Sequence, residues 1–300
     1  MTSIITSNDR NPSLANSVNQ VLILAYKEPT DRLETFLQGE GFFPQVLRQV
    51  HEPEYKDYAR IYLALLNHQK AWEIASQSTG LTLVVEADFV PVINFGKLPL
   101  PFPPHQKGVG LSWLYTCAPQ VYSVSSQGYA VGYSTAAVAY LITPIAAQYL
   151  LELERQVTLD PGPTQYFNWD GEIESFLRQR SLECYVPFRN YGEHGGKPNP
   201  EHKRAGLSPA HQADILYDRL AFTPLYAQDE PNPAWVVFYT RLKARMKGIG
   251  RLLLNKYLRL EVVKKVQYSG TNDTVCLSET LDAQALIQSR ILNAGINLRR

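Results

Sequence analysis

The 300-residue sequence has little of what defines several protein classes. Its three cysteines lie far apart with no Cys-x-x-Cys pair, which excludes a disulfide-stapled miniprotein and provides no zinc knuckle. No apolar run reaches the roughly 18 residues that a membrane-spanning helix needs, and the first 20 residues are polar, unlike a secretion signal. With 45% hydrophobic and 19% charged residues, the chain is expected to be a globular cytoplasmic protein.

The formal net charge of +1 is unevenly distributed. Residues 235–268 contain nine basic residues and one acidic residue, which gives +8, whereas the remainder contains 20 basic and 27 acidic residues, which gives −7. Segments of opposite charge commonly meet different partners. We therefore expect an acidic body and a basic segment with separate roles.

The hydrophobic pattern predicts an α/β fold. Residues 21–26 and 81–85 are short apolar runs, typical of strands covered on both faces of a sheet, and residues 58–78 repeat apolar positions at helical spacing between them. Open α/β sheets bind ligands at the carboxyl ends of their strands. We therefore expect a site at that edge, within a domain over residues 20–230.

Two carboxylates directly follow the second apolar run. Glu86 and Asp88 are two residues apart, so both can approach one hard cation such as Mn²⁺ or Mg²⁺, which in turn holds phosphate oxygens. Two solvated acids in a turn would give the same pattern. The pair therefore predicts a divalent-metal site, with a solvated turn as the alternative.

Three segments in order resemble glycosyltransferase family 25, which includes lipopolysaccharide and lipooligosaccharide galactosyltransferases. They are Asn-His and Trp within residues 67–72, LVVEADFVP at residues 83–91, and AYLITP at residues 139–144. The family pattern is Ser-His before a helix, an apolar strand ending in Glu-Asp-Asp, and Ala-Tyr-strand-Ser-Pro. Here Asn67 stands in place of the serine and Ala87 in place of the middle acid. The likeness covers roughly residues 20–195.

The resemblance implies a GT-A-like fold, with a Rossmann-like nucleotide-binding sheet and helices on both faces. It implies an inverting hexosyltransferase that uses Mn²⁺ or Mg²⁺ and a nucleoside-diphosphate sugar donor. The acceptor would be a saccharide or a lipid-linked group in surface polysaccharide or lipopolysaccharide synthesis. A catalytically inactive GT-A-like protein, which binds glycans or scaffolds a membrane complex, is the alternative.

The resemblance also implies roles at the donor site. Ala25 and Tyr26, at the end of the first strand, would border the base and ribose, and Arg32 would reach phosphate. Asp88 would be the metal ligand, with Glu86 nearer the nucleotide. A packed Tyr26 ring and a solvated Arg32 fit the same sequence.

A glycine-rich loop at residues 192–198 provides two more candidates. Imidazole is a good ligand for Mn²⁺, so His194 is a predicted metal ligand, and Lys197 offers a compact charge to phosphates. Glycines flanking His194 let the backbone approach a diphosphate closely. An exposed histidine in a flexible turn is the alternative.

An inverting transfer needs a carboxylate that takes the proton of the attacking hydroxyl. Asp170 and Glu172, beside Trp169, are the candidates, and we prefer Asp170. An aromatic ring next to a carboxylate is a common sugar platform, although an acid at a helix start is also a good N-cap. For His68, a core histidine is favoured over a catalyst.

The two ends of the chain predict separate segments. Residues 1–19 are rich in Ser and Asn and predict a flexible leader, and residues 234–300 predict a basic amphipathic helical extension. Within residues 235–268 an apolar stripe lies beside cationic positions, which suits peripheral binding to the anionic inner face of a membrane. Docking of the stripe on the body is the alternative. Nucleic acid is not an expected partner, because the aromatics lie on the stripe rather than among the basic residues.

Overall fold

The computed structural model describes residues 12–117, 119–125, 127–198 and 212–254. Most of the predicted leader, residues 1–11, and most of the predicted extension, residues 255–300, lie outside the described residues. Within the described residues no helix is long and apolar enough to cross a membrane.

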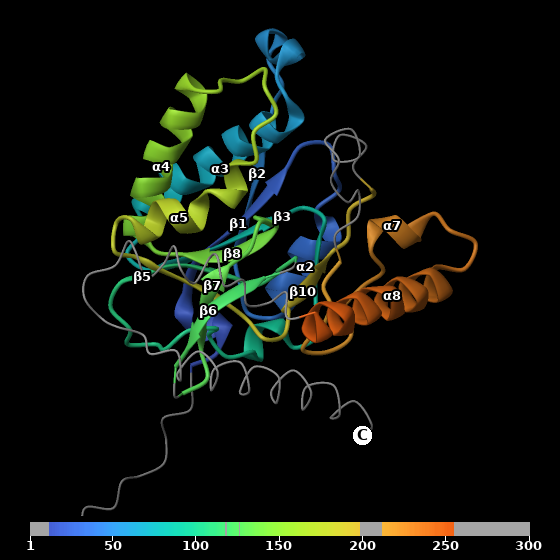
Figure 1. The fold of residues 1–300 in the computed structure, drawn as a ribbon. Coiled ribbons are helices and arrows are strands. Elements are labelled where there is room, and N and C mark those ends of the chain that lie inside the picture. Colours follow the sequence, from blue (N-terminus) through green and yellow to red (C-terminus); the bar gives the residue numbers. More distant parts are fainter. Residues whose placement is uncertain (1–11, 118, 126, 199–211, 255–300) are drawn as a thin grey trace, which may run out of the picture.

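One mixed eight-stranded sheet forms the centre, in the order β2-β1-β3-β8-β5-β9-β7-β6 (Figure 1). The strands β2, β1 and β3 are mutually parallel, β8 runs antiparallel to both β3 and β5, and β9 is parallel to β5. A separate antiparallel pair joins β4 to β10. The bounds are β1 Val18–Ala25, β2 Pro44–Arg48, β3 Leu81–Glu86, β4 Phe89–Pro91, β5 Val109–Trp113, β6 Gln120–Val124, β7 Ala130–Tyr133, β8 Ala139–Ile142, β9 Glu183–Val186 and β10 Gly192–His194.

Helices cover both faces of this sheet (Figure 1). Alternate residues of β1 enter two cores: Leu22 packs with residues of α3, α4 and α5, and Ile23 packs with residues of α2. A strand buried on both faces must be apolar throughout, which explains the continuous run in the sequence. The predicted α/β class is therefore confirmed. The helices are α1 Leu14–Ser17, α2 Asp31–Gly39, α3 Arg60–Ser76, α4 Pro144–Leu159, α5 Ile173–Arg178, α7 Leu225–Gln228 and α8 Pro233–Leu253, with short 3₁₀ turns η1 Pro53–Asp57, η2 Phe95–Lys97 and η3 Trp169–Gly171.

The helix α4 begins where its sequence predicts. Pro144 occupies its first turn, and the Thr143 hydroxyl accepts a hydrogen bond from the backbone N–H of Ala146. Proline suits this position because its missing N–H would have no partner in the helix, and the threonine satisfies one of the free donors. The helix packs against α3 on the same face of the sheet.

Two segments differ from the prediction. The ordered domain begins before residue 20, because residues 14–17 form α1, Leu14 is fully buried, and its N–H donates to the Leu98 carbonyl at 2.8 Å. The glycine-rich segment at 192–198 begins with the strand β10 rather than with a loop. Both depend on contacts with residues far away in the chain.

The apolar stripe of α8 points outward. Trp235, Phe238 and Met246 are 61%, 56% and 60% exposed, whereas Ala244 on another side of the helix is buried at 4%. Gly248 also faces the body, because a Cβ there would come within 2.8 Å of the Asp214 Cβ. Along the described part of the stripe, docking on the body does not occur. The helix packs against the body through the side that bears Arg241, Ala244 and Gly248 instead.

Candidate metal and ligand site

The site lies at the carboxyl edge of the parallel strands, as the alternation of strands and helices predicts. The turn after β3 is fixed by two backbone hydrogen bonds of 2.8 Å, from Glu86 N–H to the Val138 carbonyl and from Ala87 N–H to the Leu24 carbonyl. The chain then enters β4, which pairs with β10 so that His194 lies opposite Phe89. This pairing joins the turn to a segment more than 100 residues further along the chain.

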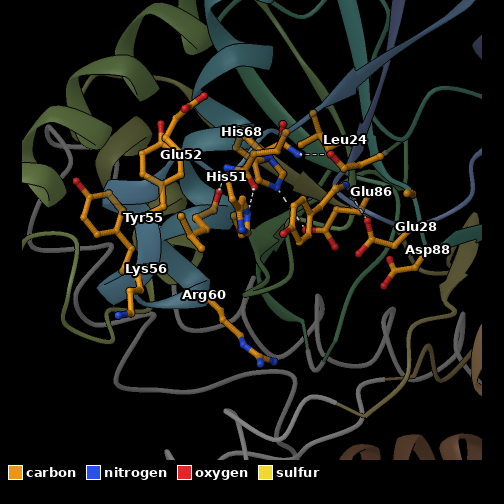
Figure 2. A pocket seen from close by; sticks show the side chains of 18 of the residues that line it. Leu24, Glu28, His51, Glu52, Tyr55, Lys56, Arg60, His68, Glu86 and Asp88 are labelled. Atoms are coloured by element: carbon orange, nitrogen blue, oxygen red, sulfur yellow. Dashed lines mark hydrogen bonds and ion pairs between the residues drawn. The ribbon is translucent and has the colours of Figure 1, made fainter.

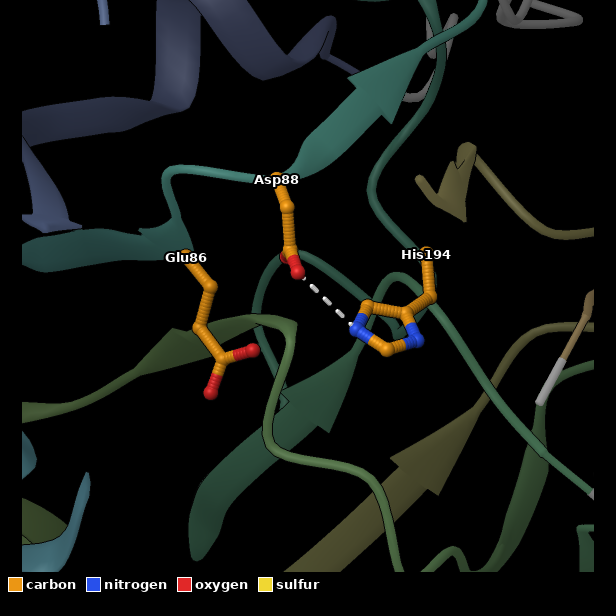
Figure 3. A group of neighbouring side chains, drawn as sticks. All are labelled: Glu86, Asp88 and His194. Atoms are coloured by element: carbon orange, nitrogen blue, oxygen red, sulfur yellow. Dashed lines mark ion pairs between the residues drawn. The ribbon is translucent and has the colours of Figure 1, made fainter. Parts of the chain in front are cut away.

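Glu86, Asp88 and His194 form one cluster (Figure 3). One potential ligand atom from each side chain lies within 4.8 Å of the others. The His194 Nε2 atom is 3.1 Å from Asp88 Oδ2, and these side chains are 22% and 20% exposed. The structure therefore brings together the two predicted metal ligands and the acid placed beside them.

The surroundings of the cluster fit a divalent ion. Asp88 Oδ1 is buried and has no hydrogen-bond partner among the described residues. A Cβ on Gly196 would overlap Asp88 Oδ2 and lie 3.0 Å from His194 Nε2, so glycine keeps the space between these atoms open. Two carboxylates and one imidazole form a mixed oxygen and nitrogen donor set, which suits Mn²⁺ better than Mg²⁺.

The protonation of His194 depends on this cluster. Burial lowers its pKa, but the charge and hydrogen bond of Asp88 raise it more, and Glu86 and Glu193 add to the rise, so that the pKa goes from the usual 6.5 to about 9. Without a metal the ring is therefore an imidazolium at neutral pH, paired with Asp88. A metal at Nε2 must displace that proton.

A buried hydrogen-bond chain orients Glu86. Trp72 Nε1–H donates to the Tyr140 hydroxyl at 2.9 Å, and that hydroxyl lies 2.8 Å from His68 Nδ1. If Tyr140 donates to Nδ1, His68 carries its proton on Nε2, 3.4 Å from Glu86 Oε1. His68 is only 1% exposed, as expected of a core histidine, and it also positions a site carboxylate. The position of His68 on the apolar face of the predicted helix indicated its burial in the sequence.

Glu86 and Asp88 line a cavity of about 990 Å³ (Figure 2). Ala25 and Tyr26 line it too, as the resemblance implies, and the Tyr26 ring stacks on His51 with centroids 3.7 Å apart. Burial, followed by the charge of Lys27, lowers the pKa of His51, so this ring is neutral at pH 7. The volume suits a nucleotide-sized ligand.

Side-chain hydrogen bonds hold the backbone of residues 25–28, which borders this cavity. The Arg48 guanidinium donates to the carbonyls of Tyr26 at 2.9 Å and Glu28 at 3.1 Å, which holds the loop after β1. Asn67 Nδ2–H donates to the Ala25 carbonyl, while its Oδ1 is buried with no hydrogen-bond partner among the described residues. Asn67 and His51 were not predicted as site residues. The cavity therefore combines a stacked aromatic pair with a free buried acceptor.

Arg32 lines a neighbouring cavity of about 270 Å³ rather than the large one. Asp88 lines both cavities, so Arg32 and Tyr26 border two different cavities that share the candidate metal ligand. Lys197 is 67% exposed and its Nζ pairs with Asp229 Oδ2 at 2.8 Å on the surface. In this structure the lysine is engaged away from the cluster.

The two predicted catalytic acids have different environments. Burial, and then the charge of Glu86, raises the pKa of Asp170 from 3.8 to about 7, and its Oδ1 has no hydrogen-bond partner among the described residues. Glu172 is exposed at the start of α5. Trp169 is buried at 3%, and its Nε1–H donates to the Ile61 carbonyl at 2.8 Å, so it is a core residue and not a sugar platform.

Comparisons with known proteins give distant structural matches. The sequence matches no family model, and no curated protein matches it. One similar solved structure is a glycosyltransferase involved in the glycosylation of the major capsid of PBCV-1, with 12% identity, a TM-score of 0.37, and 57% of this chain and 82% of that chain covered. Another is a mutant Drosophila β1,4-galactosyltransferase 7 in complex with manganese, UDP-Gal and xylobiose, with 14% identity, a TM-score of 0.31, and 56% and 65% covered. Likeness at this level does not decide activity.

Proposed function

We propose that this chain is a GT-A-like, metal-dependent glycosyltransferase that moves a sugar from a nucleoside-diphosphate donor to a saccharide or lipid-linked acceptor. The observation that carries the proposal is the cluster of Glu86, Asp88 and His194 at the edge of a nucleotide-sized cavity. A diphosphate needs a cation beside a base-binding surface. Here both features meet at the carboxyl edge of parallel strands.

At the donor site, one set of residues binds the nucleoside and another binds the metal ion. Tyr26 and His51 offer a stacked aromatic surface to the base, and Asn67 Oδ1 offers an acceptor for a donor group of base or ribose. Asp88 and His194, with Glu86 beside them, hold the divalent ion. When bound, the ion neutralises the charge that develops on the diphosphate leaving group.

At the acceptor side Asp170 takes the proton of the attacking hydroxyl. A carboxylate with a pKa of about 7 is well matched to this task, because it is a stronger base than an ordinary aspartate and is still half ionised at neutral pH. A carboxylate that takes this proton while the hydroxyl attacks the sugar in a single displacement is the general base of an inverting reaction. Glu172, which is exposed, is the second candidate.

The finer assignment to lipopolysaccharide or surface polysaccharide synthesis on the inner face of the membrane is supported by two features. One is the resemblance of the segments at 67–72, 83–91 and 139–144. The other is α8, whose apolar stripe faces outward beside the exposed Lys243 and Lys247. Such a helix is suited to lie in the headgroup region of an anionic membrane.

Thermal shift with nucleoside diphosphates, with and without Mn²⁺, tests the donor site. A ligand that binds only the folded state raises Tm, so the wild type should be stabilised by one nucleotide with Mn²⁺ far more than without it. Asp88→Asn should abolish the metal-dependent part of the shift. Glu73→Gln, a change to an acid on α3 outside the cavity, should leave it intact.

Each other result has a distinct meaning. Stabilisation by nucleotide without metal dependence would favour the inactive binding protein over the enzyme. Sugar transfer or donor hydrolysis that persists at full rate in Asp88→Asn would contradict the metal assignment. No shift with any nucleotide would refute the donor site.

A further inference from the structure

A second cavity, of about 840 Å³, lies between residues 216–224 and α8. Four arginines line this cavity, and Asp218 is the one acid among its described lining residues, so the lining is predominantly positive. Since this cavity does not contain the metal cluster, the proposed transfer reaction does not explain it. The arginines are Arg189, Arg219, Arg241 and Arg245.

Arg241 has partners within the protein. It pairs with the fully buried Glu193 and also donates to the Ala213 carbonyl. For the other three arginines, no ion-pair partner lies within 4.0 Å among the residues that the structure describes. Arg189 and Arg245 therefore form no close ion pair within the described part of the chain, although the charge of Asp214 acts on Arg245.

The arginine charges repel one another. Arg189 and Arg245 are partly buried, and burial, then Arg241 and Arg189, lower the pKa of Arg245, while the charge of Asp214 opposes this fall. Holding like charges together in a partly buried hollow costs stability unless an anion enters. Guanidinium groups match phosphate in geometry, because each presents two parallel N–H donors. The cavity is thus complementary to a phosphate group.

The exposed apolar stripe lies directly beside this cavity. Residues of an α-helix are separated by about 100°, so a residue one position on lies one quarter of the circumference away. One row of residues on α8 lines the cavity, and each residue of the apolar stripe directly follows one of these residues in the sequence. The cavity row is Ala234, Val237, Arg241 and Arg245, and the stripe is Trp235, Phe238, Leu242 and Met246.

We propose that this cavity binds the phosphate group of an anionic membrane lipid while the stripe of α8 enters the bilayer surface. A lipid supplies both a phosphate for the arginines and an apolar phase for the adjacent stripe, whereas a soluble phosphate leaves the stripe in water. The proposal concerns binding alone. It therefore stands or falls independently of sugar transfer.

The cavity also lies next to the donor side of the molecule. Phe222 and Thr223 line both it and the 270 Å³ cavity that contains Asp88 and Arg32. One chain segment therefore separates the lipid phosphate from the neighbourhood of the metal cluster. A protein held in this way keeps its donor site close to the membrane surface.

Flotation with vesicles of phosphatidylcholine, with and without phosphatidylglycerol, tests the proposal on the full chain. The wild type should float only with the anionic vesicles. The double variant R189Q/R245Q removes two charges inside the cavity, and K243Q/K247Q removes two exposed charges outside it. If binding depended only on diffuse attraction to the anionic surface, both variants would lose the same vesicle affinity, about fivefold for each lost charge. A cavity site predicts a clearly larger loss for R189Q/R245Q.

Three outcomes would overturn the proposal. They are equal losses in the two variants, stabilisation by inorganic pyrophosphate without vesicle binding, and displacement of the vesicles by an RNA oligonucleotide. Tm without vesicles checks folding, and R189Q/R245Q should be at least as stable as the wild type, because two repelling charges are gone. If that variant fails to fold, the exposed Arg219→Gln provides the same comparison against K243Q alone.

Discussion

His194 can bind either a proton or a metal ion at Nε2, and the two compete. Its pKa of about 9 means that the metal-free ring is protonated at pH 7. Binding of Mn²⁺ should therefore release about one proton at pH 7, and the apparent affinity should fall about tenfold for each pH unit below 9. Calorimetry in buffers of different ionisation enthalpy measures both. A proton release of zero, or one that persists in His194→Gln, would contradict metal binding at this nitrogen.

The same shift affects the stability of the metal-free protein. A raised histidine pKa stabilises the folded state fully below pH 6.5, and this stabilisation is lost as the pH rises through about 9. Metal binding and protonation thus stabilise the site in different pH ranges. The site has a counter-ion for Asp88 in both.

Asp170 is unfavourable for stability when it is ionised. Its pKa of about 7 lies above the 3.8 of the unfolded chain, so the folded state binds more protons between these values and loses stability as the pH rises from about 4 to 7. Asp170→Asn should therefore be more stable than the wild type at pH 8, by about 1 to 4 kcal/mol at about 1.4 kcal/mol for each pKa unit. Urea unfolding at pH 5 and pH 8 measures this gain.

The matched control is Glu172→Gln, which changes an exposed acid two residues away and should leave the pH dependence unchanged. If Asp170→Asn gains stability and loses sugar transfer, the residue is kept for function at the expense of stability. An Asp170→Asn protein with the wild-type pH dependence would contradict the raised pKa.

At the scale of elements, the contacts that hold α8 on the body include an ion pair between Arg241 and the fully buried Glu193. Burial raises the pKa of Glu193, and Arg241 opposes that rise. Arg241→Met would leave Glu193 buried without its partner, which costs about 3 to 5 kcal/mol when a buried pair is broken. We expect a large fall in Tm for Arg241→Met but a small one for Lys243→Met. Equal Tm values would show that the pair does not anchor the helix.

Elements whose own sequence favours burial were predictable. The helix α3 and the strands β1 and β3 have apolar patterns that admit few alternatives. The strand β2 was missed because it is a half-exposed edge strand. The strand β10 was missed because Gly-Glu-His is polar, and Glu193 can be buried because Arg241, 48 residues later, pairs with it and the Ala213 N–H donates to it. The direction of the α8 stripe was also open, since an apolar face does not specify whether protein or membrane covers it.

At the scale of the whole molecule, the sequence indicated the edge that bears the site but not its full composition. Glu86 and Asp88 follow a predictable strand, so their position was predictable. The roles of His51 and Asn67 depend on how a loop and a helix close over that edge. The arginine cavity joins Arg189, which follows β9, with residues 216–224 and with α8, and no local sequence pattern indicates that these segments lie together.

The strand β10 also makes two distant surfaces depend on each other. Glu193 and His194 are consecutive, so their side chains point to opposite sides of one short strand. One side holds α8 and the other belongs to the metal cluster. If metal binding stabilises this strand, it also stabilises the packing of α8 against the body. By thermodynamic linkage, a membrane that stabilises the packed α8 must then increase the affinity for the metal by the same factor. The three residues of β10 would then couple membrane binding thermodynamically to metal binding.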